Sequence, residues 1–289
     1  MSNAQLVPTT IEISDTAASL PIIDMSGLRS SNIDVRAKVG RQIGAACRDK
    51  GFFYVTGHEI SSALQQRVID QAAKLFALPP EEKAKVDKSL SQANRGYEPL
   101  RNQVLEAGAP ADVKEGFYIG QDKPLDHPDV LNGKFNQGPN LWPEALPEFR
   151  ATMEQYQREL EGVAQLLMQG VALSLGLPEQ HFASFCHDAM TTLRLLHYPP
   201  QSPSAAPGEK GCGAHTDWGG LTLLLQDDNS GLQVWDQESN DWIWAMPVPG
   251  SYVVNIGDLI SRWTNDLYRS TLHRAVSYTH LTLPTTPYV

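Results

Sequence analysis

The sequence predicts an α+β protein, with helices in the first part of the chain and a jelly-roll-like β core in the second. Before residue 176, apolar residues recur at helical spacing in several long segments. After residue 190 come short apolar runs separated by turn residues, a pattern typical of a β-sandwich or barrel. The chain has 289 residues, enough to bury one large core.

The first half is expected to alternate short strands and helices. Residues 21–24 should form a strand, and residues 35–49 a helix with Asp34 as its N-cap. Residues 51–55 are aromatic and β-branched, which favours a buried strand. An amphipathic helix should follow and end before Pro79 and Pro80, because proline cannot continue a helix.

The second half should contain one long helix and then the β core. Residues 90–140 are rich in Gly, Pro and Asn and are expected to be irregular. The long helix should cover residues 144–175, closed by Gly176 and Pro178. The expected strands are residues 191–198, 221–226, 231–235, 241–245, 251–256 and 270–276.

Composition excludes several classes of function. The net charge of −10 argues against a nucleic-acid partner. We find no apolar stretch of membrane-spanning length and no signal peptide at the N-terminus. The spacings of Cys47, Cys186 and Cys212 fit neither a disulfide framework nor a zinc knuckle. We therefore expect a cytoplasmic monomer with reduced thiols that acts on a small molecule.

The most informative residues are His215, Asp217 and His273. Residues two apart in a strand point to the same side, so His215 and Asp217 should share one face. His273 lies in a later expected strand, which the fold could bring alongside. Two imidazoles and one carboxylate make the facial triad of non-haem Fe(II) oxygenases, although the same donors also suit zinc.

The residues around this triad resemble a known family. Residues 213–227, 231–234, 255–258, 262–266 and 270–274 resemble the iron-binding core of the 2-oxoglutarate-dependent dioxygenases, isopenicillin N synthase-like branch. Residues 20–24, 51–53, 76–79 and 138–143 resemble the N-terminal region of the same branch. The resemblance covers roughly residues 20–276. It implies a double-stranded β-helix core that uses Fe(II), 2-oxoglutarate and O₂, with His215, Asp217 and His273 as the metal ligands.

The resemblance also implies a site for 2-oxoglutarate. Tyr198 matches a tyrosine of the family that contacts the co-substrate. The arginine that holds the far carboxylate should stand where this chain has Leu283, so the expected arginine is absent. Arg274 cannot easily replace it, because as a neighbour of His273 in a strand it should point away from the metal.

Candidate substrate residues are fewer and less distinctive. Arg194 has the same strand parity as Tyr198 and could face the site, or it could be a surface residue at a strand end. Trp218 and Phe117 could line a substrate pocket, although a buried aromatic residue is more often part of the core.

The expected organisation has four parts. Residues 20–140 form the N-terminal region, 141–187 a long linking helix, and 188–276 the oxygenase domain. Residues 277–289 do not resemble the family and read like the translation of a sequencing adapter, so the last core strand is expected to be missing.

The expected function is the 2-oxoglutarate-dependent oxidation of a small organic substrate by hydroxylation, desaturation or cyclisation, with release of succinate and CO₂. The alternatives are an oxidase of the isopenicillin N synthase or ethylene-forming type, which uses no 2-oxoglutarate, and an inactive truncated fragment.

Overall fold

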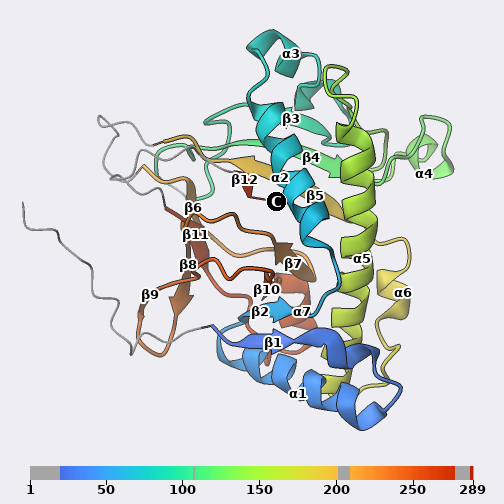
Figure 1. Cartoon of the computed structure of the whole chain (residues 1–289), viewed down its shortest axis with the longest axis vertical. Helices are drawn as coiled ribbons and strands as arrows, with labels where there is room; N and C mark the ends of the chain where they lie inside the picture. Colours follow the sequence, from blue (N-terminus) through green and yellow to red (C-terminus); the bar gives the residue numbers. More distant parts are fainter. Residues whose placement is uncertain (1–19, 107, 201–208, 277–286, 289) are drawn as a thin grey trace, which may run out of the picture.

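The computed structural model describes residues 20–106, 108–200, 209–276 and 287–288 (Figure 1). Its helices are α1 Ile33–Asp49, α2 Ser62–Phe76, α3 Pro80–Ala84, α4 Pro128–Leu131, α5 Phe149–Ser174, α6 Ala183–Cys186 and α7 Asp258–Trp263. Its strands are β1 Ile22–Asp24, β2 Phe52–Thr56, β3 Gly96–Glu98, β4 Glu115–Gly120, β5 Thr192–His197, β6 Cys212–His215, β7 Leu221–Leu224, β8 Leu232–Asp236, β9 Asp241–Trp244, β10 Tyr252–Ile256, β11 His273–Ala275 and β12 Pro287–Tyr288. Short 3-10 helices occupy Met25–Arg29 and Lys88–Leu90.

The strands of the described ranges form three four-stranded sheets, ordered β1-β2-β10-β7, β6-β11-β8-β9 and β12-β5-β4-β3. The first two sheets share a buried apolar cluster that includes Phe52, Tyr54, Val253, Leu232, Val234 and Ile243. The jelly-roll core and the α+β class are therefore confirmed. Pairing of β6 with β11 and of β7 with β10 within these sheets positions the residues of the candidate site.

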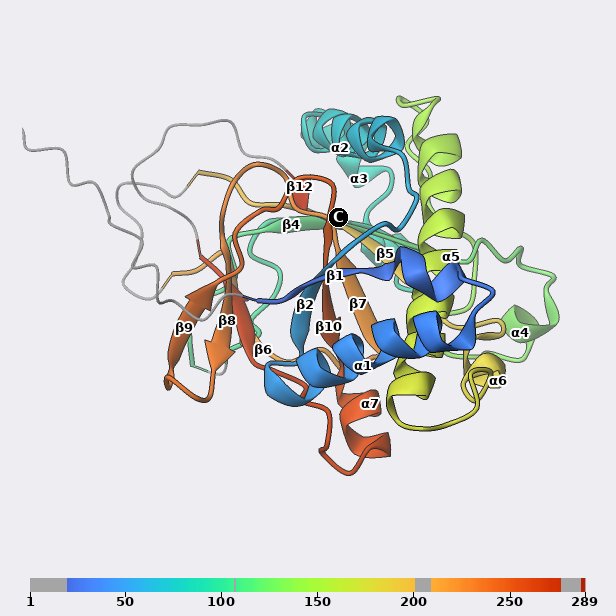
Figure 2. The same cartoon turned by 60° about the horizontal axis from the view of Figure 1, so that its bottom comes forward.

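The third sheet packs against the helices. Figure 1 shows α5 running along one side of the molecule, in contact with α1 and α2. Phe117 and Ile119 of β4 and Leu193 and Leu195 of β5 join the large core cluster on this side. Because side chains alternate along a strand, the residues between them project to the opposite face. Figure 1 and the turned view in Figure 2 show α1 beside β1 and β2, at one edge of the sheet that also contains β10 and β7.

Two helix starts differ from the sequence prediction. Helix α1 begins at Ile33, and its N-cap is Asn32 rather than Asp34, because the Asn32 side chain accepts the Asp34 backbone N–H at 2.9 Å. Helix α5 begins at Phe149 rather than at residue 144. Pro147 explains this delay, because the residue before a proline is disfavoured in a helix.

The prediction that residues 90–140 are irregular was correct for most of the segment but missed three short elements. This segment contains β3, β4 and α4. Strand β4 pairs with β3 on one edge and with β5 on the other, so its backbone hydrogen bonds come from partners distant in sequence. Gly116, Gly120 and the charged Glu115 lower its apparent strand propensity.

The sequence prediction also concerned the C-terminal tail and membrane-spanning helices. Leu283, where the family arginine is expected, lies outside the described residues, as does most of the tail. Within the tail, β12 pairs with His197 and Leu196 of β5 in antiparallel register. No helix of the described residues is both long and apolar enough to cross a membrane.

Candidate metal centre

His215, Asp217 and His273 come together at one point. Each offers one ligand atom, and these atoms all lie within 4.8 Å of one another. His215 ends β6 and is the antiparallel partner of His273, which begins β11. The two imidazole centroids are 4.3 Å apart. The pairing of β6 with β11 therefore brings His273 next to His215, although the two residues are far apart in the sequence.

Asp217 reaches this point differently from the sequence prediction. It was expected to lie in the same strand as His215, but β6 ends at His215 and Asp217 lies in the connection that follows. Its backbone carbonyl accepts the N–H of Asp258, the first residue of α7, at 2.7 Å. Its Oδ1 lies 3.7 Å from the Nε2 atom of each histidine. The connection places the carboxylate where strand alternation was expected to place it.

Backbone carbonyls fix the tautomer of both histidines. His215 Nδ1 lies 2.8 Å from the carbonyl oxygen of Gly213, and His273 Nδ1 lies 3.1 Å from that of Thr271. A carbonyl oxygen can only accept, so Nδ1 donates the hydrogen bond in both rings. Nε2 is then unprotonated in each neutral ring and can bind a metal.

Hydrogen bonds also fix the orientation of the Asp217 carboxylate. Its Oδ2 accepts hydrogen bonds from the Thr222 hydroxyl at 2.6 Å and from the Asn255 amide at 2.9 Å. Oδ1 is left to face the two histidines. Sequence reasoning missed the roles of Thr222 and Asn255, although both lie in segments that carry the family resemblance. Only the pairing of β7 with β10 brings the two residues to one carboxylate oxygen.

The electrostatics of His273 and Asp217 suit a metal ion, whereas at His215 the neighbouring groups outweigh burial and raise the pKa of the ring. Burial lowers the pKa of His273, and the charge of Asp217 offsets this only in part, so the ring is held in the neutral form that binds metals. Burial by itself would raise the pKa of Asp217. The neighbouring His273 and the hydrogen bonds from Thr222 and Asn255 outweigh it, and the pKa lies below its usual value. A neutral histidine and an ionised carboxylate fit a divalent metal ion.

Cys212 also lies beside this centre. A register shift in β6 pairs Cys212 with Ala275 and His215 with His273, which places Cys212 and His215 towards the same side. Cys212 Sγ is 3.8 Å from His215 Nδ1 and 3.0 Å from Lys114 Nζ. The sequence identified Cys212 only as a reduced thiol, because a bulge cannot be read from the spacing of residues.

Arg194 of β5 alternates with the core residues Leu193 and Leu195 and so lies on the side that faces away from the helices. Tyr198 directly follows this strand. Arg194 donates to Glu98 at 3.2 Å and to Gln103 at 2.8 Å, and its guanidinium lies over the ring of Tyr118. Its Nε is buried and has no hydrogen-bond partner among the described residues. The ring of Tyr198 packs against Gly211, the residue before β6, so closely that a Cβ there would lie 2.7 Å from it.

The remaining sequence candidates lie in different surroundings. Phe117 is fully buried and packs edge-on against Phe149. Trp218, directly after Asp217, is 60% exposed. Arg274 donates to Gln233 of β8 at 2.7 Å and lies over the ring of Trp242 of β9, which agrees with the expectation that it points away from the triad.

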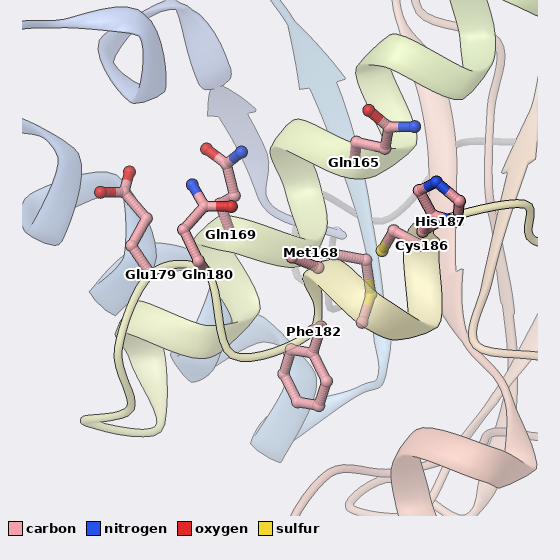
Figure 3. A pocket seen from close by; sticks show the side chains of 9 residues that line it. Gln165, Met168, Gln169, Glu179, Gln180, Phe182, Cys186 and His187 are labelled. Carbon is pink, nitrogen blue, oxygen red and sulfur yellow. The ribbon is translucent and has the colours of Figure 1, made fainter.

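The surface also has a hollow of about 180 Å³ at the junction of α5 and α6 (Figure 3). Gln165 and Met168 of α5 line it, together with Cys186 and His187 at the end of α6. None of the triad residues lines it. The hollow is therefore separate from the candidate metal centre.

Comparisons with known proteins agree with this geometry. Residues 20–145 match the family described as non-haem dioxygenase in morphine synthesis N-terminal, and residues 189–281 match the 2OG-Fe(II) oxygenase superfamily. A 2-oxoglutarate-Fe(II) type oxidoreductase of Emericella nidulans, hxnY, is 44% identical over 89% of this chain and 75% of its own length. The chain belongs to the 2OG-Fe(II) oxygenase superfamily.

Other similar proteins belong to the same superfamily. The 2-oxoglutarate-dependent dioxygenase citB of Monascus ruber is 44% identical over 89% of this chain and 80% of its own length. A full-length Neurospora crassa protein, crystallised in complex with alpha-KG, has a TM-score of 0.82 and 30% identity, covering 96% of this chain and 85% of its own. The same protein has also been solved with alpha-KG and thymine, with a TM-score of 0.81. Fe(II), 2-oxoglutarate and O₂ are thus the cofactor and co-substrates of the superfamily to which this oxidoreductase belongs.

Proposed function

We propose that His215, Asp217 and His273 are the Fe(II) ligands of a 2-oxoglutarate-dependent dioxygenase that oxidises a small organic molecule. The observation that carries this proposal is the convergence of their three ligand atoms within 4.8 Å. When bound, iron together with 2-oxoglutarate and O₂ supplies the oxidising chemistry, and succinate and CO₂ are released. Zinc would accept the same donors, and membership of the superfamily favours iron.

The protein's own contribution is orientation. The carbonyls of Gly213 and Thr271 keep both imidazoles turned with Nε2 towards Asp217. Thr222 and Asn255 hold Asp217 Oδ2, so that Oδ1 points to the same place. Such partners raise metal affinity because the ligands are already in position before the ion arrives.

The test is the change His273→Ala, with His127→Ala as the matched control. His127 caps α4, which lies on the opposite side of the molecule from β11 (Figure 1). We expect His273→Ala to lose Fe(II) binding, measured by metal titration, and O₂-dependent succinate formation. His127→Ala should keep both. Succinate formation that persists in His273→Ala would refute the ligand assignment.

The same assay separates the alternative functions. O₂ uptake without succinate would indicate an oxidase that uses no 2-oxoglutarate. Fe(II) binding without turnover under any condition would indicate an inactive fragment. Succinate formed in step with O₂ uptake supports the proposed reaction and excludes both alternatives.

Tyr198 is the residue we propose for contact with 2-oxoglutarate. Its position against Gly211 supports this role, because Gly211 directly precedes the strand that carries His215. A tyrosine hydroxyl can donate to a carboxylate or keto oxygen. The partner for the far carboxylate is not assigned, since Leu283 lies outside the described residues.

Arg194 and Trp218 are the proposed contacts of the organic substrate. The unpartnered Nε of Arg194 is a donor available to an acceptor group on a ligand. We leave Phe117 out, because packing against Phe149 accounts for its burial. A screen for small molecules that stimulate succinate formation, repeated on Arg194→Gln, tests Arg194. Equal stimulation of both proteins would remove it from the substrate site.

Three further properties are proposed from composition and comparison. The N-terminal region, long helix and oxygenase domain divide near residues 140 and 187, and limited proteolysis would test these boundaries. The three free thiols support a cytoplasmic location. A monomer that binds no nucleic acid is consistent with the charge of −10, and light scattering with and without DNA would check it.

A further inference from the structure

Lys114 and Cys212 form a buried amine–thiol pair. Lys114 Nζ lies 3.0 Å from Cys212 Sγ, and the two residues are 3% and 6% exposed. Asp112 Oδ2 holds the same amine at 2.7 Å. A buried ammonium group is normally paired with an anion. Asp112 is that anion here, and the second contact of the same amine is the sulfur atom of Cys212.

The surrounding backbone fixes this pair. Asp112 Oδ1 accepts the N–H of Gly213, the residue after Cys212, at 2.9 Å. Lys114 directly precedes β4, and the N–H of Val113 donates to the carbonyl of Lys210 at 2.9 Å. The segment before β4 and the segment of β6 are therefore held side by side, with amine and sulfur in contact.

The other two cysteines lack this arrangement. Cys47 is buried within the helical core, and Cys186 lies at the end of α6. No hydrogen bond joins either thiol to a lysine within the described ranges of the chain. The amine–thiol contact is therefore a property of the site beside the triad and not of thiols in this protein generally.

We propose that Lys114 and Cys212 are a modification site, at which oxidation joins Nζ to Sγ through one bridging oxygen atom. The inference rests on the proposed function in one respect: O₂, the co-substrate, is the oxidant. Such a bridge needs an amine and a thiol in contact, shielded from other nucleophiles and close to where oxygen is used. The contact of Cys212 with His215 places the pair beside the proposed iron site.

The reaction balances with one molecule of O₂. The S–H bond and one N–H bond break, and an S–O bond and an N–O bond form. One oxygen atom enters the bridge, and the other leaves as water with the two hydrogens. Sulfur and nitrogen together give up the four electrons that O₂ accepts. The extra proton of the ammonium form passes to Asp112 Oδ2, which already accepts its hydrogen bond.

The bridge would change the surroundings of the metal centre and leave the three proposed ligands chemically unmodified. It would tie the segment before β4 covalently to β6 and remove the thiol that contacts His215. We expect the bridged protein to form succinate several-fold more slowly and to recover after treatment with a thiol reductant.

The experiment uses the full chain and peptide mass spectrometry without reductant. One sample contains Fe(II), 2-oxoglutarate and air but no organic substrate, and a second is kept without O₂. A third is metal-free protein treated with hydrogen peroxide, two molecules of which replace one O₂. We expect a peptide that joins Lys114 to Cys212 in the first and third samples. Its mass should exceed the sum of the two peptides by one oxygen atom less two hydrogen atoms.

The variants and the succinate assay separate this inference from the proposed function. Lys114→Arg and Cys212→Ser should abolish the joined peptide, and Cys186→Ser should retain it. Succinate formed in a parallel reaction with a molecule found in the substrate screen reports the proposed function independently. Cys212 oxidised to a sulfinic or sulfonic acid with Lys114 unmodified, in wild-type protein treated with peroxide, would overturn the inference even if succinate is formed.

Discussion

His273 of β11 lies directly opposite His215 of β6, and their imidazole centroids are 4.3 Å apart. This cross-strand pair brings together two residues that are far apart in sequence, and the Asp217 carboxylate completes the group at 3.7 Å from each Nε2. The geometry of the centre therefore depends on strand register and on the groups that hold each ligand.

The hydroxyl of Thr222 should matter for metal affinity. Thr222→Val removes the 2.6 Å hydrogen bond to Asp217 Oδ2 while keeping the shape of the side chain. Loss of such a partner costs about 10–100-fold in metal affinity. Metal titration would measure this loss. Thr216→Val is the matched control, because the Thr216 hydroxyl donates to Asp258 and not to Asp217. Equal affinities in the two variants would contradict the role of Thr222.

Tyr198→Phe should weaken the binding of 2-oxoglutarate. A hydrogen bond to a charged group contributes about 1.5–3 kcal/mol, which corresponds to roughly 10–100-fold in affinity. Calorimetric titration of metal-loaded protein with 2-oxoglutarate, without O₂, would measure the change. Tyr268→Phe is the control, since its hydroxyl contacts Ser174 at the end of α5. Unchanged binding in Tyr198→Phe would assign the co-substrate contact to another residue.

Glu115 should make stability depend on pH. Burial by itself would raise the pKa of Glu115, but hydrogen bonds from His197, Tyr97 and Lys83 outweigh it and lower the pKa from 4.5 to about 2. Because the pKa is lower in the folded state, this stabilisation is present above pH 4.5 and is lost as the pH falls towards 2.

The corresponding experiment compares the wild-type protein with Glu115→Gln. The difference in their free energies of unfolding, measured with urea at a series of pH values, should shrink as the pH falls from 4.5 to about 2. Glu81→Gln, at an exposed position of α3, should show no such trend. A difference between wild type and Glu115→Gln that is constant over this range would contradict the assignment.

The ion pair between Lys50 and Asp236 should be needed for stability. The two groups lie 2.9 Å apart, with side chains only 6% and 5% exposed, and join the end of α1 to β8. Lys50→Met leaves the buried carboxylate with hydrogen bonds from Ser239 but without its ion-pair partner, which should cost up to about 3–5 kcal/mol. Urea unfolding would measure this cost.

Two variants control for the loss of the lysine itself. Lys38→Met, at an exposed position of α1, should change stability by less than about 0.5 kcal/mol. Combining Lys50→Met with Asp236→Asn should recover much of the lost stability, because the amide carries no charge and keeps an oxygen that can accept from Ser239. If the double variant were as unstable as Lys50→Met, the unpaired charge would not be the cause.

The sequence by itself determined the fold class and most of the strands and helices, and it pointed to the three residues of the candidate metal centre. Hydrophobic periodicity reports which face of each element is buried, so α2, α5 and the strands β7 to β10 could be found from it. The identities of His215, Asp217 and His273 indicate their chemistry, because few side chains bind a divalent transition metal.

The tertiary structure decided what depends on partners distant in the chain. Strand β4 forms because β3 and β5 satisfy its backbone, and Asp217 is placed by a connection rather than by strand alternation. Thr222 and Asn255 meet at one carboxylate oxygen only when β7 pairs with β10. The bulge in β6 brings Cys212 to His215. Local patterns show which residues can bind or pack, but register and bulges decide which of them meet, because they arise from pairing between distant segments.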